Sequence, residues 1–127
     1  MKTIISTKEA PSAIGPYNQA TGFENLIFTS GQIPLVPQTM EIVSGGIKEQ
    51  SLLVMDNLNA VLKEAGSSMN NILKTTCYLS DMDNFAAFNE VYAQYFSSED
   101  APARATIAVK TLPKNVLVEV DAIAFKK

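Results

Sequence analysis

The sequence contains no histidine, no tryptophan, a single cysteine (Cys77) and a single arginine (Arg104). Without histidine, the chain cannot build a Ser-His-Asp triad or an imidazole metal site, and we expect no metal. One cysteine forms neither an intrachain disulfide nor a zinc cluster, and a lone thiol fits a reducing compartment. Carboxylates, tyrosine, lysine and the one arginine remain as the groups that can move protons or bind anions.

Charge and long apolar runs are also sparse. Charged residues make up 18% of the chain and the formal net charge is −3, which argues against a polyanion such as RNA as the main partner. No apolar run approaches the roughly 20 residues that cross a bilayer. The first residues, Met1–Ser6, are too few and too polar for a secretory signal. We therefore expect a cytoplasmic protein that binds neither nucleic acid nor membrane.

What is present fits one folded domain spanning residues 1–127. The chain has 127 residues, of which 46% are hydrophobic, so it can bury an ordinary core. Glycine and proline crowd the first forty residues and divide them into turns and short strands, with β-like runs at Lys2–Ser6 and Asn25–Ser30. Apolar residues then recur every three or four positions, which predicts a helix over 47–65 that ends before Gly66.

The second half alternates between strand and helix patterns. Asn71–Ser80 is rich in β-forming residues, and Asp81 or Asp83 can cap a following helix. Aromatic residues on that helix predict a face turned to the core: Phe85, Phe88, Tyr92, Tyr95 and Phe96. Two further strands, 104–110 and 115–125, are expected to form a hairpin. The class is therefore α+β, with two helices on one face of an antiparallel or mixed sheet.

Two helices leave the second face of such a sheet uncovered. In strand 72–79, Leu73, Cys77 and Leu79 are expected on one side and Ile72 and Tyr78 on the other, so both faces carry apolar residues. An exposed apolar face of this size is typical of an interface. We therefore expect a homo-oligomer, unless the N-terminal segment folds back over that face.

Two charged residues interrupt apolar strands. Arg104 is suited to bidentate capture of a carboxylate or phosphate, and the alternative is a structural ion pair with Glu119 or Asp121 across the hairpin. Glu119, within Val116–Val120, is either on a solvated face or kept for chemistry. A symmetric hairpin would place Thr106 opposite Glu119 and Arg104 diagonally near it, whereas a one-residue slip in register would put them on opposite faces.

Several segments together resemble the Rid (YjgF) family of reactive-intermediate deaminases, most closely its RidA branch. The stiff turns 13–17 and 29–34 present Tyr17 and the Gly31 backbone. The other matching segments are Asn57-Leu58, Pro102–Arg104, Leu112–Lys114 and Glu119–Ala124. The resemblance runs essentially end to end, in the family's order and spacing.

The resemblance implies a chorismate-mutase-like α+β fold and a homotrimer whose sheets line a central barrel, with active sites between adjacent subunits. It implies hydrolysis of 2-iminobutanoate and 2-iminopropanoate to 2-keto acids and ammonia, without a cofactor. Two other functions stay open: a non-catalytic trimer that senses small carboxylates, and a ribonuclease or translation inhibitor.

The same resemblance assigns roles by position. Arg104 matches the arginine that binds the substrate carboxylate, Tyr17 a catalytic tyrosine of the cleft, and Glu119 the acid that positions or activates water. Gly31 and Asn89 match residues that line the cleft. Thr106 stands where RidA proteins commonly have cysteine, so a backbone role there is expected and a thiol role is not. Met40 replaces a usual turn glycine without expected catalytic meaning.

Overall fold

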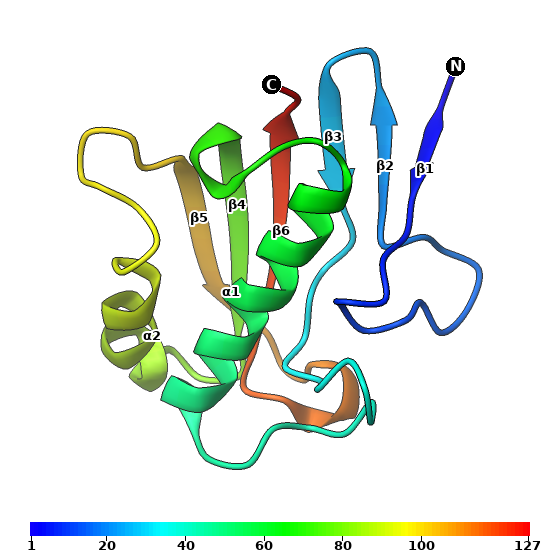
Figure 1. Ribbon diagram of the computed structural model, residues 1–127. Coiled ribbons are helices and arrows are strands. Elements are labelled where there is room, and N and C mark those ends of the chain that lie inside the picture. The colour runs from blue at the N-terminus through cyan, green and yellow to red at the C-terminus, as the bar shows by residue number, and fades with distance from the viewer.

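The computed structural model describes residues 1–127 as one six-stranded sheet with two helices on one face (Figure 1). Both helices lie on the same side of the sheet, which confirms the predicted α+β class. The strands are β1 (Thr3–Ile5), β2 (Ala20–Phe23), β3 (Leu26–Thr29), β4 (Ile72–Leu79), β5 (Ala103–Ala108) and β6 (Val118–Phe125). The helices are α1 (Ile47–Glu64) and α2 (Phe85–Tyr92), and 3-10 turns are η1 (Met69–Asn71), η2 (Met82–Asn84) and η3 (Pro113–Asn115).

The sheet order is β1-β2-β3-β6-β4-β5, and only β4 and β5 are parallel. The predicted hairpin between the last two strands is therefore wrong, because β4 lies between β5 and β6. A chain that leaves β4 through α2 returns as a parallel strand beside β4, as a crossover helix requires. Thr106 consequently pairs with Cys77, and Glu119 pairs with Tyr78.

The predicted helix over 47–65 is confirmed as α1. Its buried face includes Val54, Leu58, Val61 and Leu62, which are fully inaccessible to solvent. At the start of α1, the Glu49 carboxylate accepts the Gly46 backbone N–H at 2.9 Å. After α1, Gly66 has a φ of +79°, a conformation in which glycine carries no steric cost.

The aromatic stripe of the second predicted helix faces the core as expected. Phe88 and Tyr92 are buried, while Phe85, Tyr95 and Phe96 pack against the same core from its margin. The Asp81 carboxylate accepts the Asp83 N–H at 2.8 Å and so caps η2, the turn that leads into α2.

A bulge in β4 changes which residues share a face. The register with β6 shifts between Ile72 and Lys74, so Ile72 is buried while Leu73 is 49% exposed. Thr75, Cys77 and Leu79 face the helices, as an alternating strand requires. The expectation that Leu73 shares their face is wrong, because one extra residue reverses the alternation.

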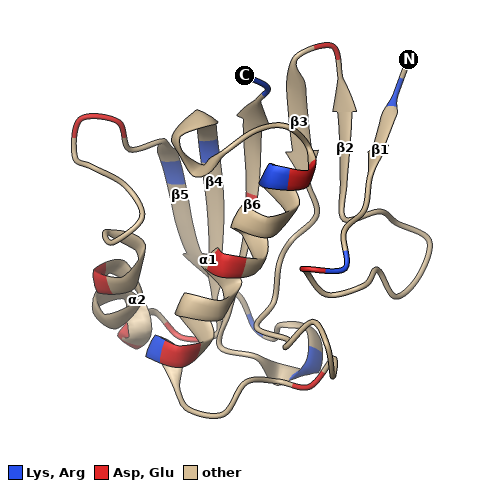
Figure 2. Ribbon diagram, in the orientation of Figure 1, with Lys and Arg blue, Asp and Glu red and all other residues tan.

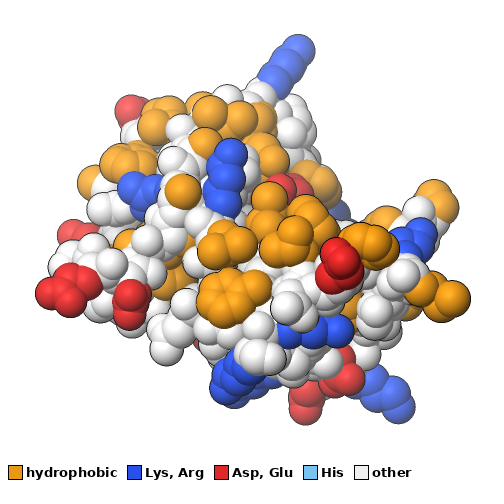
Figure 3. Space-filling view, turned by 90° about the horizontal axis from the view of Figure 1, so that it is seen from above, with side chains coloured by type: hydrophobic (Ala, Val, Ile, Leu, Met, Phe, Trp, Pro, Cys, Tyr) orange, Lys and Arg blue, Asp and Glu red, His pale blue; other side chains and the backbone are white.

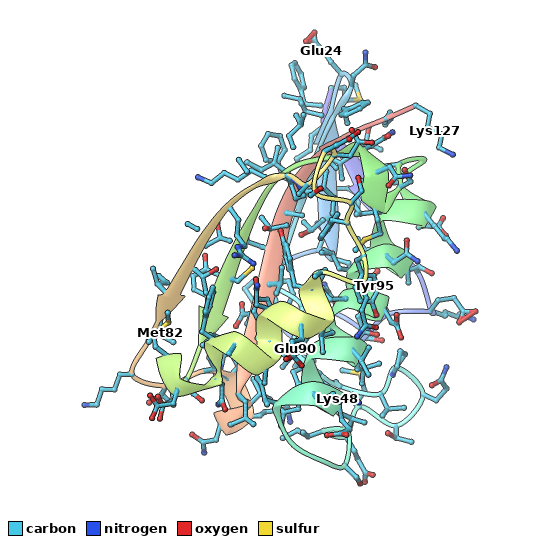
Figure 4. All side chains as sticks on the ribbon, turned by 90° about the vertical axis from the view of Figure 1, so that its left-hand side faces the viewer. Glu24, Lys48, Met82, Glu90, Tyr95 and Lys127 are labelled. Carbon is cyan, nitrogen blue, oxygen red and sulfur yellow. The ribbon has the colours of Figure 1, made fainter.

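The other face of the sheet has no cover. The segment before β2 packs on the helix side, where Ala10 joins the core, so the proposed N-terminal cover is wrong. Figure 4 views the sheet nearly edge-on, with the helices on one side and free side chains on the other. The exposed apolar residues of the open face, hereafter the open-face patch, are Ile4, Phe23, Leu26, Phe28, Ile107 and Phe125.

The open-face patch reaches the end of the sheet at which the β2–β3 turn lies. Seen from above, hydrophobic side chains cover much of this end (Figure 3). Few charged residues lie on the strands themselves (Figure 2). No helix in the chain is both long and apolar enough to span a membrane. An apolar face of this kind is a typical protein interface.

Candidate functional site

The guanidinium of Arg104 is held in place by α2. One of its N–H groups donates to the Asn89 side-chain oxygen at 2.7 Å. Its central carbon lies 4.7 Å from the centre of the Tyr92 ring and 5.5 Å from that of Phe85, both within cation–π range. Arg104 is exposed at the free edge of the sheet, yet three residues of α2 contact its guanidinium.

Buried groups behind Arg104 hold this arrangement. Tyr92 shares a hydrogen bond of 2.7 Å with the Thr75 hydroxyl, and Thr75 pairs with Arg104 across the β4–β5 ladder. This hydrogen bond fixes the ring on which the guanidinium rests. The alternative ion pair is absent, because neither Glu119 nor Asp121 is a partner of Arg104. The positive charge therefore remains free for a ligand.

Arg104 opens into a pocket between α2 and the segment that leads into β5. The residues that line this pocket are Asn89, Tyr92, Ala93, Phe96, Ser97, Ser98, Ala101, Pro102 and Arg104. No carboxylate is among them. A cation with free N–H groups beside aromatic rings and hydroxyls is suited to a small organic anion.

Glu119 lies in a second hollow with Tyr17 and Gly31. Ser30, Ile33 and Pro113 complete its lining. Two backbone hydrogen bonds between Gln32 and Val120, of 2.8 and 3.1 Å, hold the segment after β3 against β6. The structure thus brings together three of the predicted site residues: Tyr17, Gly31 and Glu119.

Gly31 allows the Glu119 carboxylate to take its position. A Cβ atom at Gly31 would lie 1.9 Å from Oε2 of Glu119, far inside van der Waals contact. A side chain at Gly31 would therefore displace the carboxylate. Tyr17 is half exposed, and its hydroxyl accepts the Ile14 N–H at 3.2 Å.

The electrostatics of this second hollow shift Glu119 toward its protonated form, relative to a carboxyl group in water. Partial burial, and then the nearby charge of Asp121, raise the pKa of Glu119 above its ordinary value. Glu119 has no hydrogen-bond or ion-pair partner in the chain. A carboxyl group with a raised pKa and no partner in the chain is a candidate general acid or base.

The two groups of site residues are separated within one chain. Arg104 is level with Thr75 of β4 and Ala122 of β6, and Glu119 is three residues before Ala122. These steps correspond to about 10 Å across the strands and about 10 Å along them. Moreover, the two side chains lie on opposite faces of the sheet. Arg104 and Ala122 face the helices, and Glu119, three residues before Ala122 on β6, points to the other face. No small molecule can contact both in a single chain.

Thr106 lies near the Arg104 group rather than the Glu119 group. Its hydroxyl is buried without a hydrogen-bond partner, beside Cys77 on the paired strand. Cys77 is fully buried, and burial raises the pKa of its thiol to about 11. At neutral pH the Cys77 thiol is therefore protonated and unreactive, so Cys77 does not supply a reactive thiol beside Thr106.

Sequence reasoning missed the aromatic support of Arg104. Tyr92 was assigned to the core alone, but its ring also supports the guanidinium. Both roles require an aromatic residue on the inner face of α2, so the pattern could not separate them. Asn89, one turn earlier on the helix, was expected to line the site, and it contacts Arg104.

Comparison with known proteins identifies the family. A family model described as "Endoribonuclease L-PSP" matches residues 7–126. "Putative reactive intermediate deaminase TdcF" of Escherichia coli K12 is 44% identical over 99% of this chain and 98% of its own length. The chain belongs to the Rid family. A RutC family protein of Pyrococcus abyssi is 52% identical over 99% of this chain and 98% of its own length.

Solved structures of Rid proteins share the whole fold. A crystal structure of Escherichia coli TdcF with bound serine has a TM-score of 0.91 at 42% identity, covering 98% of this chain and 99% of that chain. RidA from the Antarctic bacterium Psychrobacter has a TM-score of 0.92 at 38% identity, covering 97% of this chain and 98% of its own. The predicted resemblance to the Rid family is thereby confirmed.

Proposed function

We propose that this Rid protein is a cofactor-free hydrolase of short 2-imino acids and their enamine tautomers. Its expected substrates are 2-iminobutanoate and 2-iminopropanoate, and its products are the 2-keto acids and ammonia. The similarity to TdcF, named as a reactive intermediate deaminase, supports the reaction class. The observation that carries the proposal is the Arg104 guanidinium, anchored by Asn89 and Tyr92 but free of any carboxylate.

The substrate carboxylate fits Arg104. Two parallel charge-assisted hydrogen bonds to a guanidinium fix both the position and the plane of a carboxylate. This places the adjacent imine carbon a short distance from the arginine. Asn89 and Tyr92 prevent the guanidinium from following a ligand into solvent, so the substrate is positioned rather than merely attracted.

The imine carbon must then lie close to Glu119 and Tyr17. In a single chain, these two residues are too far from Arg104 for one substrate molecule to contact all three. We propose that the working protein is a homotrimer in which the Glu119 hollow of one chain faces the Arg104 pocket of the next. The open-face patch and the unpaired edge of β5 both support assembly. Closed rings built from repeated head-to-tail contacts place one such composite site at each interface.

The chemical demand on this site is small. Imines hydrolyse readily in water, so a rate increase far below the 10⁶-fold or more of most enzymes is sufficient. Positioning and one acid–base group, worth about 10²–10⁴-fold, meet that demand. Water adds to the imine carbon, Glu119 serves in proton transfer, and Tyr17 closes the pocket.

A coupled assay tests the proposal. Threonine dehydratase acting on threonine releases the imine, and semicarbazide competes with water for it. The protein should speed formation of the free 2-keto acid and lower the fraction of imine trapped as semicarbazone. Arg104→Lys should lose about 10²-fold in kcat/KM, since ammonium lacks the planar fork. Acceleration by Arg104→Lys equal to that of the parent would exclude Arg104 from the reaction.

The assay also separates the alternatives. A non-catalytic sensor would bind 2-keto acids in calorimetry through Arg104 while leaving the imine lifetime unchanged. A ribonuclease would cleave RNA in a salt-sensitive way that Arg104→Ala abolishes. A net charge of −3 and the absence of histidine both disfavour RNA cleavage.

A further inference from the structure

A second carboxylate stands next to Glu119 on the open face and has no role in the reaction proposed above. Asp121 follows Glu119 by two positions on β6, so both side chains project from the same face. Both are half-buried, and neither forms an ion pair in the chain. Two carboxyl groups placed this close cannot both ionise without mutual repulsion.

Tyr78 of β4 lies beside Glu119 on the sheet and forms a hydrogen bond with Asp121. It pairs directly with Glu119 in the β4–β6 ladder, yet its hydroxyl donates to Oδ2 of Asp121 at 3.1 Å. The Tyr78 hydroxyl therefore forms a hydrogen bond with Asp121 and none with Glu119, so the two carboxyl groups have different surroundings. Burial raises the pKa of Asp121, and the Tyr78 hydrogen bond opposes that rise, whereas Glu119 receives no such bond.

We propose that Tyr78 and Asp121 are positioning residues that keep the proton on Glu119, so that Glu119 enters the reaction as the proton donor to the departing nitrogen. This inference rests on the proposed imine hydrolysis. It assigns Glu119 a protonated starting state. Tyr78 and Asp121 touch neither Arg104 nor its pocket, so they act through Glu119.

The proton transfers of the reaction balance when Glu119 has this role. Water adds across the C=N bond, which gives a carbinolamine with one hydroxyl and one amino group. Glu119 protonates the amino nitrogen, the C–N bond breaks and ammonia leaves. As the C=O bond forms, the hydroxyl proton passes to the Glu119 carboxylate and restores the starting state. No oxidant, metal or further reactant is required.

Within one chain, no cation is among the causes that shift the pKa of Glu119, and Lys114 lines the neighbouring pocket with Tyr17 and Gly31. In the proposed trimer, the Arg104 guanidinium that faces this hollow is neutralised by the substrate carboxylate. On its own strand the charged neighbour is Asp121, and from β4 comes the neutral Tyr78. The Ser30–Ile33 segment contributes no titratable side chain, and the N-terminal loop contributes Tyr17. Burial raises the pKa of Asp121, and the Tyr78 hydrogen bond and the charge of Lys74 on β4 partly oppose that rise. Burial and the charge of Asp121 both raise the pKa of Glu119, in agreement with the geometry.

The pH dependence of kcat/KM tests the inference. Because a proton donor is lost above its pKa, Asp121→Asn should move the alkaline decline of activity about one unit lower. Tyr78→Phe should move it in the same direction by less, since Asp121 then competes for the proton. Ionisation of the imine itself affects every variant equally. Ile123→Val, which alters packing on the same face without changing charge, should leave the decline in place.

Carbon-13 NMR of the Glu119 carboxyl provides a readout independent of turnover, with Glu119→Gln identifying the signal. A midpoint that drops in Asp121→Asn supports the inference. An unchanged midpoint overturns it, even if Asp121→Asn loses activity, because that loss would then be structural. If the midpoint drops in Asp121→Asn but the parent protein hydrolyses no imine, the effect of Asp121 on Glu119 is supported and the proposed function is wrong.

Discussion

Gly31 shows how one missing side chain sets the position of a functional group. The Glu119 carboxylate occupies the space that a Cβ at Gly31 would need. A displacement of about 1 Å in a reacting group can cost 10²-fold in rate. The hollow that holds Glu119 therefore depends on glycine at this position.

Gly31→Ala should accordingly lower kcat/KM about 10²-fold while the protein remains folded. Steady-state kinetics and circular-dichroism melting measure the two effects separately. Gly46→Ala is the matched control, because a Cβ there meets no atom within 4 Å. Equal activity in both variants would show that the carboxylate position does not matter.

The ionised form of Glu119 also destabilises the folded protein. Its pKa is raised in the folded protein above the ordinary value of 4.5, chiefly by burial. Its contribution to stability is thus fully present below the unfolded pKa and is lost as pH rises through the folded pKa. Glu119→Gln should melt at a higher temperature than the parent at pH 7.5, and the difference should vanish by about pH 4. A constant difference at all pH values would contradict this.

At the element scale, helix α1 contributes more residues to the buried core than any other element. Leu58 is fully buried between the helix and the sheet, so Leu58→Ala should cost about 2–5 kcal/mol of unfolding free energy. Urea denaturation measures this loss. Exposed Leu73, in the β4 bulge, is the matched control, and Leu73→Ala should cost far less. Similar losses would show that the bulge residue is buried in the assembled protein.

The elements also show what a sequence pattern can and cannot predict. The period of α1 is set by contacts within the helix and by its buried face, so its ends were predicted within one residue. Sheet neighbours depend on the path of the whole chain, so β5 and β6 were wrongly paired. The bulge at Leu73 left no trace in the pattern, and β2, short and containing Gly22, was missed.

The site was predictable to a similar degree and for similar reasons. Arg104 stood out because it is the only arginine, and Glu119 because it interrupts an apolar strand. Their placement on opposite faces could not be predicted, since it depends on the position of β4 between them. The Tyr92 support and the Tyr78–Asp121 contact are tertiary and carry no sequence signature of their own.

At the scale of the whole molecule, the proposed sites, each built from two chains, lead to a specific prediction. Arg104→Lys and Glu119→Gln chains should each be nearly inactive alone. Co-expressed in equal amounts, they should form mixed trimers in which about a quarter of the sites contain both native residues. Activity should therefore return to about a quarter of the parent's, with sedimentation confirming trimers in every sample. Failure to regain activity would place all catalytic groups in one chain.

The position of Arg104 on β5, at the outer edge of the sheet, has a final consequence. An edge strand keeps a row of backbone N–H and C=O groups that a neighbouring chain can bond. In the proposed trimer, a subunit that docks there lies beside the guanidinium, so binding of the proposed substrate would stabilise the association of subunits. Turnover per chain should consequently fall on dilution, and 2-keto acids should hold diluted subunits together by mass action.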